Sequence, residues 1–221
     1  MSQQLMQQLF GILLSVPAAL ISIAVHESAH GYVSYKLGDP TAKNLGRITL
    51  NPLKHFDLLG FICMVFFHIG WAKPVPVNPR YYKNPRKGMA ITAAAGPISN
   101  ILMAFIGVIG YELISLTRFR EANTVYYICS TVYMFFIIFA TLNVYLAIFN
   151  LIPVPPFDGS RIAYIFMPPK AYFGIMKYER YIMLGMIALL YIGVLDGPLD
   201  FITDAVLGGM EWLVELIPIF K

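Results

Sequence analysis

Long apolar runs constrain this chain more than any other feature of its sequence. Three of them are long enough to cross a hydrocarbon core, which takes about 20 helical residues: about Leu9 through Tyr35, Met89 to Leu116 and Val125 to Phe149. Tyr181 to Leu195 is short for a span, and Phe201 to Phe220 could span or lie in the interface. With 58% hydrophobic and only 13% charged residues, the chain has too few polar side chains to cover a water-facing surface. We predict an all-α polytopic membrane protein with four to five transmembrane helices.

The connection between the first two spans carries two further expected elements. Arg47–Leu50 lies between a glycine and Asn51-Pro52, which predicts a short β-strand. Leu58–Trp71 is apolar but too short to cross, which predicts a re-entrant segment in the bilayer. Such a strand and segment could pair with an extended substrate by strand addition. There is no internal repeat or long linker, so we expect one integral-membrane domain over residues 1–221.

The basic residues predict the orientation of the chain in the bilayer. If the first span enters from outside and Leu58–Trp71 does not cross, all of the 16 Lys and Arg except Arg118, Arg120 and Lys221 fall on the inner side. We therefore expect a multi-pass protein of a cell membrane with an outside N-terminus. The net charge of +4 forms no basic stripe, which argues against a nucleic-acid partner.

A metal-binding pattern lies inside the first apolar run. His26 and His30 are four residues apart, so both imidazoles lie on one helical face and can reach one zinc ion. Glu27 adjoins the first histidine and can act as general base toward an activated water molecule. Ionisable residues within a membrane helix are costly and usually mark function. The plainer interpretation is a hydrogen-bonded polar cluster that faces other helices.

Two histidines leave a catalytic zinc ion one protein ligand short. His55, Asp57 and His68 in the re-entrant region could approach, whereas Glu112 lies near the far end of the second span. Depth favours Asp158, because the third span ends inward near Phe149 and a proline-rich segment returns the chain to the level of the histidines. We expect Asp158 as third ligand, with Asp57 next; a helix N-cap is the structural alternative for Asp158.

Two amides occupy the third span or its end. Asn143 and Asn150 could each pair with a neighbouring helix. Asn150 could instead bind the backbone of an extended substrate or stabilise an oxyanion. The small residues of Ala93–Gly96 at the start of the second span allow close helix approach.

Four motifs together resemble the site-2 protease family of intramembrane zinc metalloproteases. They are VHESAHGY around His26, GWAKPVPVNP at 70–79, AGPISN at 95–100 and NLIPVPPFDG at 150–159. The resemblance is to the minimal prokaryotic branch without a PDZ or CBS domain. It implies that His26, His30 and Asp158 hold one zinc ion, that Glu27 is the catalytic base and that Asn150 contacts substrate backbone. It also implies a transmembrane protein substrate, a location in the plasma membrane of a prokaryote and an active site toward the cytoplasm.

A protein of another functional class is the alternative interpretation. A small zinc-binding membrane transporter or scaffold would share the polar membrane interior but needs no general base. The intact Glu27 favours the hydrolase, and its replacement by glutamine would separate the two.

Overall fold

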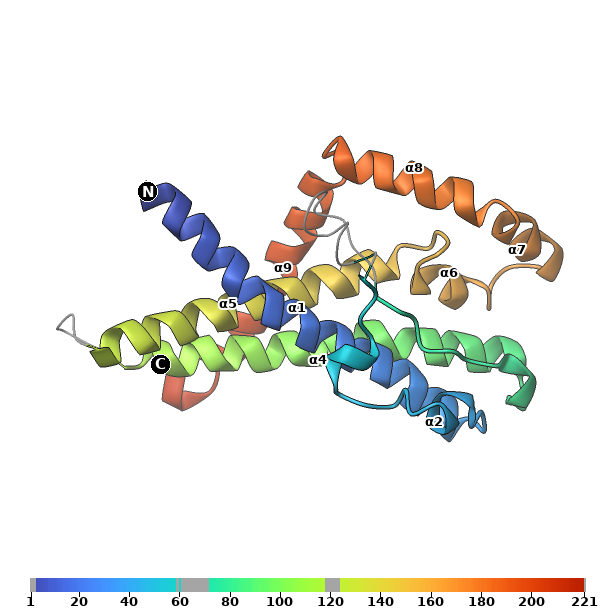
Figure 1. Cartoon of the computed structure of the whole chain (residues 1–221), viewed down its shortest axis with the longest axis horizontal. Coiled ribbons are helices and arrows are strands. Elements are labelled where there is room, and N and C mark those ends of the chain that lie inside the picture. Colours follow the sequence, from blue (N-terminus) through green and yellow to red (C-terminus); the bar gives the residue numbers. More distant parts are fainter. Residues whose placement is uncertain (1–2, 59, 61–71, 118–123, 221) are drawn as a thin grey trace.

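Three long helices build the molecule. The computed structural model describes residues 3–58, 60, 72–117 and 124–220. Its long helices are α1 (Gln3–Lys36), α4 (Pro85–Ser115) and α5 (Thr124–Leu151), each long and apolar enough to cross a membrane. Helices α4 and α5 lie side by side in opposite directions, and α1 crosses both of them (Figure 1). The three long helices predicted from the apolar runs are therefore present.

Small residues bring α4 and α5 into close contact. A Cβ atom added to Gly107 of α4 would lie 2.9 Å from the Cβ of Ala140 and 3.0 Å from its backbone nitrogen in α5. This position therefore accepts only glycine without separating the helices. The core that forms around the contact also takes side chains from α9 (Asp196–Glu215): Ala104, Val108, Tyr111, Ala140, Val144, Met210 and Val214.

The C-terminal part of the chain contains a bent pair of helices. Neither α8 (Glu179–Tyr191) nor α9 alone is long and apolar enough to cross a membrane, whereas the two together are, with a bend of 81° between them. Gly193 adopts a φ of 78° directly after α8 ends, a left-handed conformation that favours glycine and commonly ends a helix. The described chain thus has three candidate spans, or four if the bent pair is one broken span. The upper end of the predicted range, five, is not supported.

The predicted strand at Arg47–Leu50 is wrong. Residues 48–50 form bends, and no strand occurs in the part of the chain that the structure describes. The carbonyl oxygen of Thr49 accepts hydrogen bonds from Ser28 Oγ at 2.5 Å and from His55 Nε2 at 2.8 Å, so side chains occupy the group that a partner strand would need. The expected re-entrant segment Leu58–Trp71 lies, apart from residues 58 and 60, outside the described residues.

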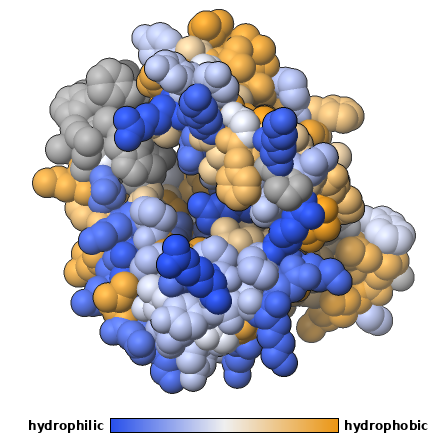
Figure 2. Space-filling view, turned by 90° about the vertical axis from the view of Figure 1, so that its right-hand side faces the viewer, coloured by the Kyte–Doolittle hydropathy of each residue, from blue (hydrophilic) through white to orange (hydrophobic). Residues whose placement is uncertain are grey.

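Short elements cluster at one end of the three long helices. The C-terminal ends of α1 and α5 and the N-terminal end of α4 point the same way, and α2 (Thr41–Asn44), α6 (Asp158–Ala163) and α7 (Pro169–Met176) lie there too (Figure 1). Two 3-10 helices, Pro52–Lys54 and Pro79–Tyr81, belong to the connection before α4, and a third, Pro218–Phe220, follows α9. Seen from this end, hydrophilic side chains surround a hollow in the surface (Figure 2).

Candidate metal centre

The two histidines of the motif lie one turn apart on the inward face of α1. Their ring centroids are 4.6 Å apart at an interplanar angle of 89°, and their Nε2 atoms are 3.0 Å apart. Both residues are buried. The four-residue spacing thus brings both imidazoles to one point, which is the geometric requirement for a shared metal ion.

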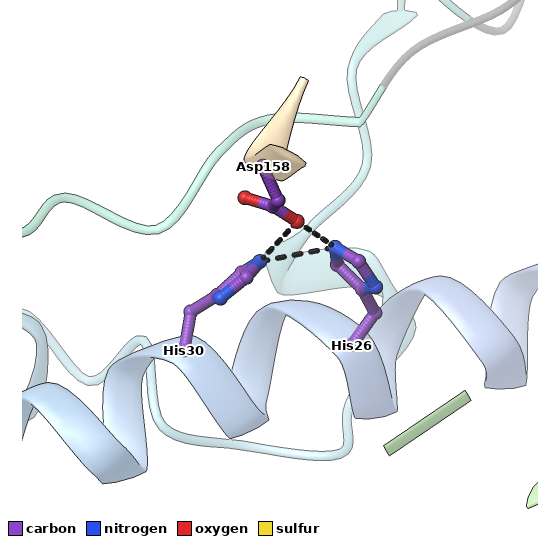
Figure 3. Close-up of side chains that lie close together, drawn as sticks. All are labelled: His26, His30 and Asp158. Carbon is purple, nitrogen blue, oxygen red and sulfur yellow. Dashed lines mark hydrogen bonds and ion pairs between the residues drawn. The ribbon is translucent and has the colours of Figure 1, made fainter. Parts of the chain in front are cut away.

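A turn after α5 returns the chain to the histidines. Residues 152–157 carry three of the chain's prolines, and Asp158 opens α6 directly behind them. The next residue must be glycine, because a Cβ atom at Gly159 would collide with the carbonyl oxygens of Leu151 and Ile152. This close approach to the end of α5 holds Asp158 over α1, with its carboxylate pointing at both imidazoles (Figure 3).

The three side chains converge through one atom each. Asp158 Oδ2 lies 3.2 Å from the Nε2 atom of His26 and 3.2 Å from that of His30. On the far side of each ring, Nδ1 faces an oxygen: Asn100 Oδ1 at 2.5 Å for His26, and the carbonyl oxygen of Thr92 at 2.7 Å for His30. A neutral imidazole carries one ring proton. With that proton on Nδ1, both Nε2 atoms present a lone pair to the carboxylate.

This donor set fits a metal ion. Asp158 Oδ2 is buried, and the two Nε2 atoms that face it donate no hydrogen bond to it in this tautomer; three acceptor atoms so close together repel one another unless positive charge lies between them. Two imidazoles and a carboxylate are a common three-ligand set of catalytic zinc. Among the described residues, these three form the one group of His, Cys, Asp and Glu side chains with such spacing.

The charge state of Asp158 suits the same role. Burial raises the pKa of its carboxyl, but the interactions that His26 and His30 make with it when their rings are protonated lower that pKa by more. The net pKa lies well below its usual range, so the carboxylate is anionic at neutral pH. An anion in a buried position needs a cationic partner.

Glu27 lies beside the three converging residues without joining them. Its Oε2 atom accepts a hydrogen bond from the backbone N–H of Val75 at 2.7 Å. Within the described chain, its Oε1 atom has no hydrogen-bond partner. The extended segment around Val75 therefore orients the carboxylate and leaves one oxygen available.

A cavity of about 330 Å³ opens onto these residues. His26, Glu27, His30 and Asp158 line it together with Asn150, which stands near the end of α5. The amide of Asn150 donates to the carbonyl oxygen of Leu146 at 2.9 Å. The remaining wall is mostly apolar: Ile23, Val75, Leu146, Phe149, Pro156 and Phe157.

The other candidate ligands have different surroundings. Asp57 Oδ1 accepts from the backbone N–H of residue 60 at 2.8 Å, as a helix cap does. The buried His55 is bound to Thr49, and Glu112 lies three residues before the end of α4 and pairs with Ser115. His68 falls outside the described residues. The structure therefore brings Asp158, and none of the other described candidates, to the histidines.

Two contributors from α4, Gly96 and Asn100, were not assigned to the centre from the sequence, and Asn143 of α5 was expected only to pair with a neighbouring helix, as it does with Asn100. Gly96 lies so close to the imidazoles that a Cβ atom would be 2.5 Å from His26 Cε1 and 2.6 Å from His30 Cε1. Asn100 bonds His26 and also Asn143. The only signal in the sequence is the presence of amides within apolar runs, because pairing between helices far apart in the chain leaves no local pattern.

Comparison with known proteins identifies relatives of the same kind. Residues 123–194 match the model of Peptidase family M50. The chain is 41% identical to "Putative zinc metalloprotease YwhC" of Bacillus subtilis over 162 residues, which cover 73% of each chain. It is 26% identical to "Putative zinc metalloprotease Rip2" of Mycolicibacterium smegmatis over 66% of this chain and 54% of that protein.

A third relative comes from an archaeon. The chain is 32% identical to "Putative zinc metalloprotease MJ0611" of Methanocaldococcus jannaschii over 48% of this chain and 49% of that protein. No solved structure matches the chain significantly. Identity of 41% across nearly three quarters of both sequences shows that the chain belongs to the M50 family of peptidases, the site-2 protease family of zinc metalloproteases.

Proposed function

We propose that the protein is an intramembrane zinc metalloendopeptidase that hydrolyses peptide bonds of transmembrane protein substrates. The observation that carries the proposal is the convergence of His26, His30 and Asp158 beside Glu27 in one cavity. Two of the three proposed ligands and the proposed base belong to a helix that is long and apolar enough to span a bilayer.

The chain's residues divide the chemistry between them. His26, His30 and Asp158 would hold one zinc ion through Nε2, Nε2 and a carboxylate oxygen. A zinc ion held there supplies Lewis-acid chemistry, by activating water and polarising the scissile carbonyl. Glu27 accepts a proton at its Oε1 atom and later returns it to the leaving amine. The hydrogen bond from Val75 keeps the carboxylate turned toward the cavity throughout.

Asn150 is proposed to bind the substrate backbone. Its Nδ2 atom is tied to Leu146, which sets the orientation of the amide group. Its Oδ1 atom has no partner among the described residues, so it can accept a hydrogen bond from an N–H group of an extended substrate. An oxyanion would need the amide's second N–H instead.

The proposed substrate class follows from the surroundings of the cavity. Most of its wall is apolar, and three helices around it are candidate spans. A substrate helix hides its peptide carbonyls in hydrogen bonds, so it must unwind locally before attack. We therefore infer that an extended stretch of a membrane-spanning segment enters the cavity.

The location and orientation are also proposals. We infer a multi-pass protein of the plasma membrane with its active site toward the cytoplasm. Support comes from the basic residues, which gather on the side of the membrane where α1 ends at Lys36 and α4 begins at Pro85. Hydrophilic side chains surround the hollow at this end of the helices (Figure 2).

Glu27→Gln tests the proposed reaction. Glutamine keeps the volume and can still accept the hydrogen bond from Val75, but it cannot take up a proton. Cleavage of a single-span test polypeptide, co-reconstituted in proteoliposomes, should fall by at least about 10²-fold, while bound zinc stays at the wild-type level. Mass spectrometry of the products and metal analysis measure the two.

The same experiment separates the protease from a zinc-binding transporter or scaffold. A transporter or scaffold has no use for a general base, so wild-type protein would bind zinc and leave the polypeptide uncut. Equal cleavage by the wild type and Glu27→Gln would contradict the role of Glu27. Cleavage confined to a soluble peptide of the same sequence would contradict the membrane substrate.

A further inference from the structure

A buried chain of polar side chains leads away from His26. Ser22, Asn100 and Asn143, which lie on α1, α4 and α5, are all fully buried. His26 Nδ1 faces Asn100 Oδ1 at 2.5 Å, Asn100 Nδ2 donates to Asn143 Oδ1 at 2.8 Å, and Asn143 Nδ2 donates to Ser22 Oγ at 2.7 Å. Three amide and hydroxyl groups in an apolar helix bundle are costly unless each is satisfied.

At the far end of this chain of hydrogen bonds, the donor and acceptor of each bond are fixed. The hydroxyl of Ser22 donates its proton to the carbonyl oxygen of Ala18 at 2.7 Å. The Nδ2 group of Asn143 also donates to the carbonyl oxygen of Phe139 at 2.8 Å. Backbone carbonyls can only accept. The Nδ2 group of Asn143 must therefore face Ser22 and Phe139, and its Oδ1 atom must face Asn100.

The donor and acceptor roles fixed at Asn143 in turn fix those at Asn100 and at the imidazole of His26. Because Asn143 presents an acceptor, Asn100 must turn its Nδ2 group toward Asn143 and its Oδ1 atom toward His26. The Nδ1 atom of His26 must then donate, so the ring proton sits on Nδ1 and Nε2 keeps a lone pair. An amide flip at Asn100 would reverse this and put the proton on Nε2, where it competes with a metal ion.

We propose that Asn100 and Asn143 are positioning residues: together they hold the ring proton of His26 on Nδ1 and keep its Nε2 atom free for the metal ion. The proposal rests on the proposed function insofar as His26 binds a metal. Asn100 supplies the acceptor, and Asn143 prevents Asn100 from turning around. His30 needs no such device, because its Nδ1 atom faces a backbone carbonyl, that of Thr92, which cannot be reversed.

A rescue experiment separates this role from simple packing. Asn143→Leu fills a similar volume but leaves, among the described residues, only the long contact of Asn100 Nδ2 with the carbonyl oxygen of Ser22, at 3.4 Å, to hold the amide against a flip. Zinc affinity should therefore fall about 10- to 100-fold, the usual effect of losing an outer partner of a metal ligand. Asn100→Asp offers an acceptor oxygen in either orientation. It should therefore restore zinc affinity when it is combined with Asn143→Leu, although neither change alters His26 or the other two proposed ligands.

The measurement is the zinc dissociation constant of the purified full chain in detergent, by competition with a chromophoric chelator. Thr203→Val, in α9, serves as a matched control, because its buried hydroxyl has no hydrogen-bond partner among the described residues; it should bind zinc like the wild type. Wild-type affinity in Asn143→Leu would overturn the proposal. So would a double variant as weak as Asn143→Leu alone.

A second pair of variants covers the case in which Asn143→Leu does not fold. Asn100→Leu removes the acceptor and should bind zinc about 10- to 100-fold more weakly than Asn100→Asp; equal affinities would overturn the proposal. These measurements need no substrate. A wild-type protein that binds zinc but cuts nothing would refute the proposed function, and the comparison of affinities would still decide the role of Asn100 and Asn143.

Discussion

At Gly96 the backbone of α4 passes close to the two imidazoles. The nearest atoms to an added Cβ belong to His26 and His30, at 2.5 to 2.6 Å, which is too short for any real contact. The absence of a side chain at this position therefore allows the backbone of α4 to close one wall around the rings. From the sequence alone, Gly96 is equally well explained as a helix-packing residue. Only the structure shows that it lies against the metal centre.

Gly96→Ala should damage the metal centre without unfolding the chain. The added methyl group must displace the imidazoles or α4, so zinc affinity should fall at least about 10-fold. Gly208→Ala is the matched control, because nothing lies within 4 Å of its added Cβ; it should keep its zinc affinity and gain about 0.5–1 kcal/mol in helix stability. Unchanged zinc binding in Gly96→Ala would contradict the geometry described for this wall.

The roles of residues within one motif could be predicted from their spacing, whereas most hydrogen bonds between residues far apart in the sequence could not be predicted. His26, Glu27 and His30 follow from spacing on one helix. Asp158 required an argument about depth, and the structure brings it to the histidines. Asn100 and Glu27 each have a partner far away in sequence, Asn143 and Val75. A single sequence holds no local signal for such pairs.

At the scale of elements, a buried aspartate ties the end of α1 to the segment before α4. Asp39 is fully buried. It accepts hydrogen bonds from Ser34 Oγ at 2.8 Å, from the backbone and side chain of Thr41, and from the N–H of Asn78 at 2.7 Å. Three residues before Asn78, Val75 binds Glu27. Asp39 therefore helps to hold the segment that orients the proposed base.

Asp39→Asn should destabilise the protein in a pH-dependent way. An amide turns donors toward donors, which costs about 1–3 kcal/mol for the groups left unpaired. Burial raises the pKa of the Asp39 carboxyl, but hydrogen bonds from Thr41, Asn78 and Ser34 lower it by more, so its pKa lies below 3.8. A lowered folded-state pKa contributes stability above the unfolded value of 3.8, and this contribution disappears as pH falls through the lower folded pKa.

Thermal unfolding in detergent, followed by circular dichroism, checks this prediction. The variant should unfold at a lower temperature than the wild type at neutral pH, and the gap should narrow once the pH drops below 3.8. In that window the difference in free energy of unfolding between the variant and the wild type depends on the charge of the Asp39 carboxylate. Identical midpoints at neutral pH would show that Asp39 does not anchor the segment.

Helix ends and the missing strand show what apolar runs cannot reveal. The second span was expected from Met89, but α4 begins at Pro85, because Asn84 caps it by accepting from the N–H of Lys87 and proline occupies the first helical position. Charged residues of this first turn hide the helix from a hydropathy argument. The composition of Ile48 and Thr49 favours a strand, but a strand also needs a partner strand, and none occurs among the described residues. The predicted strand therefore does not form.

At the scale of the whole molecule, the spans and the basic ends agree with one arrangement. Three helices are long and apolar enough to cross a bilayer, and the chain turns back near the same end after α1 and after α5 (Figure 1). That end carries α2, α6 and α7 and the turn that delivers Asp158. Helix identity follows from composition, whereas the bend between α8 and α9 depends on one glycine conformation that hydropathy does not register.

Two imidazoles of α1 and the carboxylate of Asp158, from the turn after α5, are proposed to hold one zinc ion. Metal analysis of the purified, folded protein beside Asp158→Ala and His26→Ala is the decisive measurement. We expect about one zinc ion per wild-type chain and loss of most of it in either variant. A folded wild-type protein without bound zinc, or an Asp158→Ala variant that retains the full amount, would contradict this proposal.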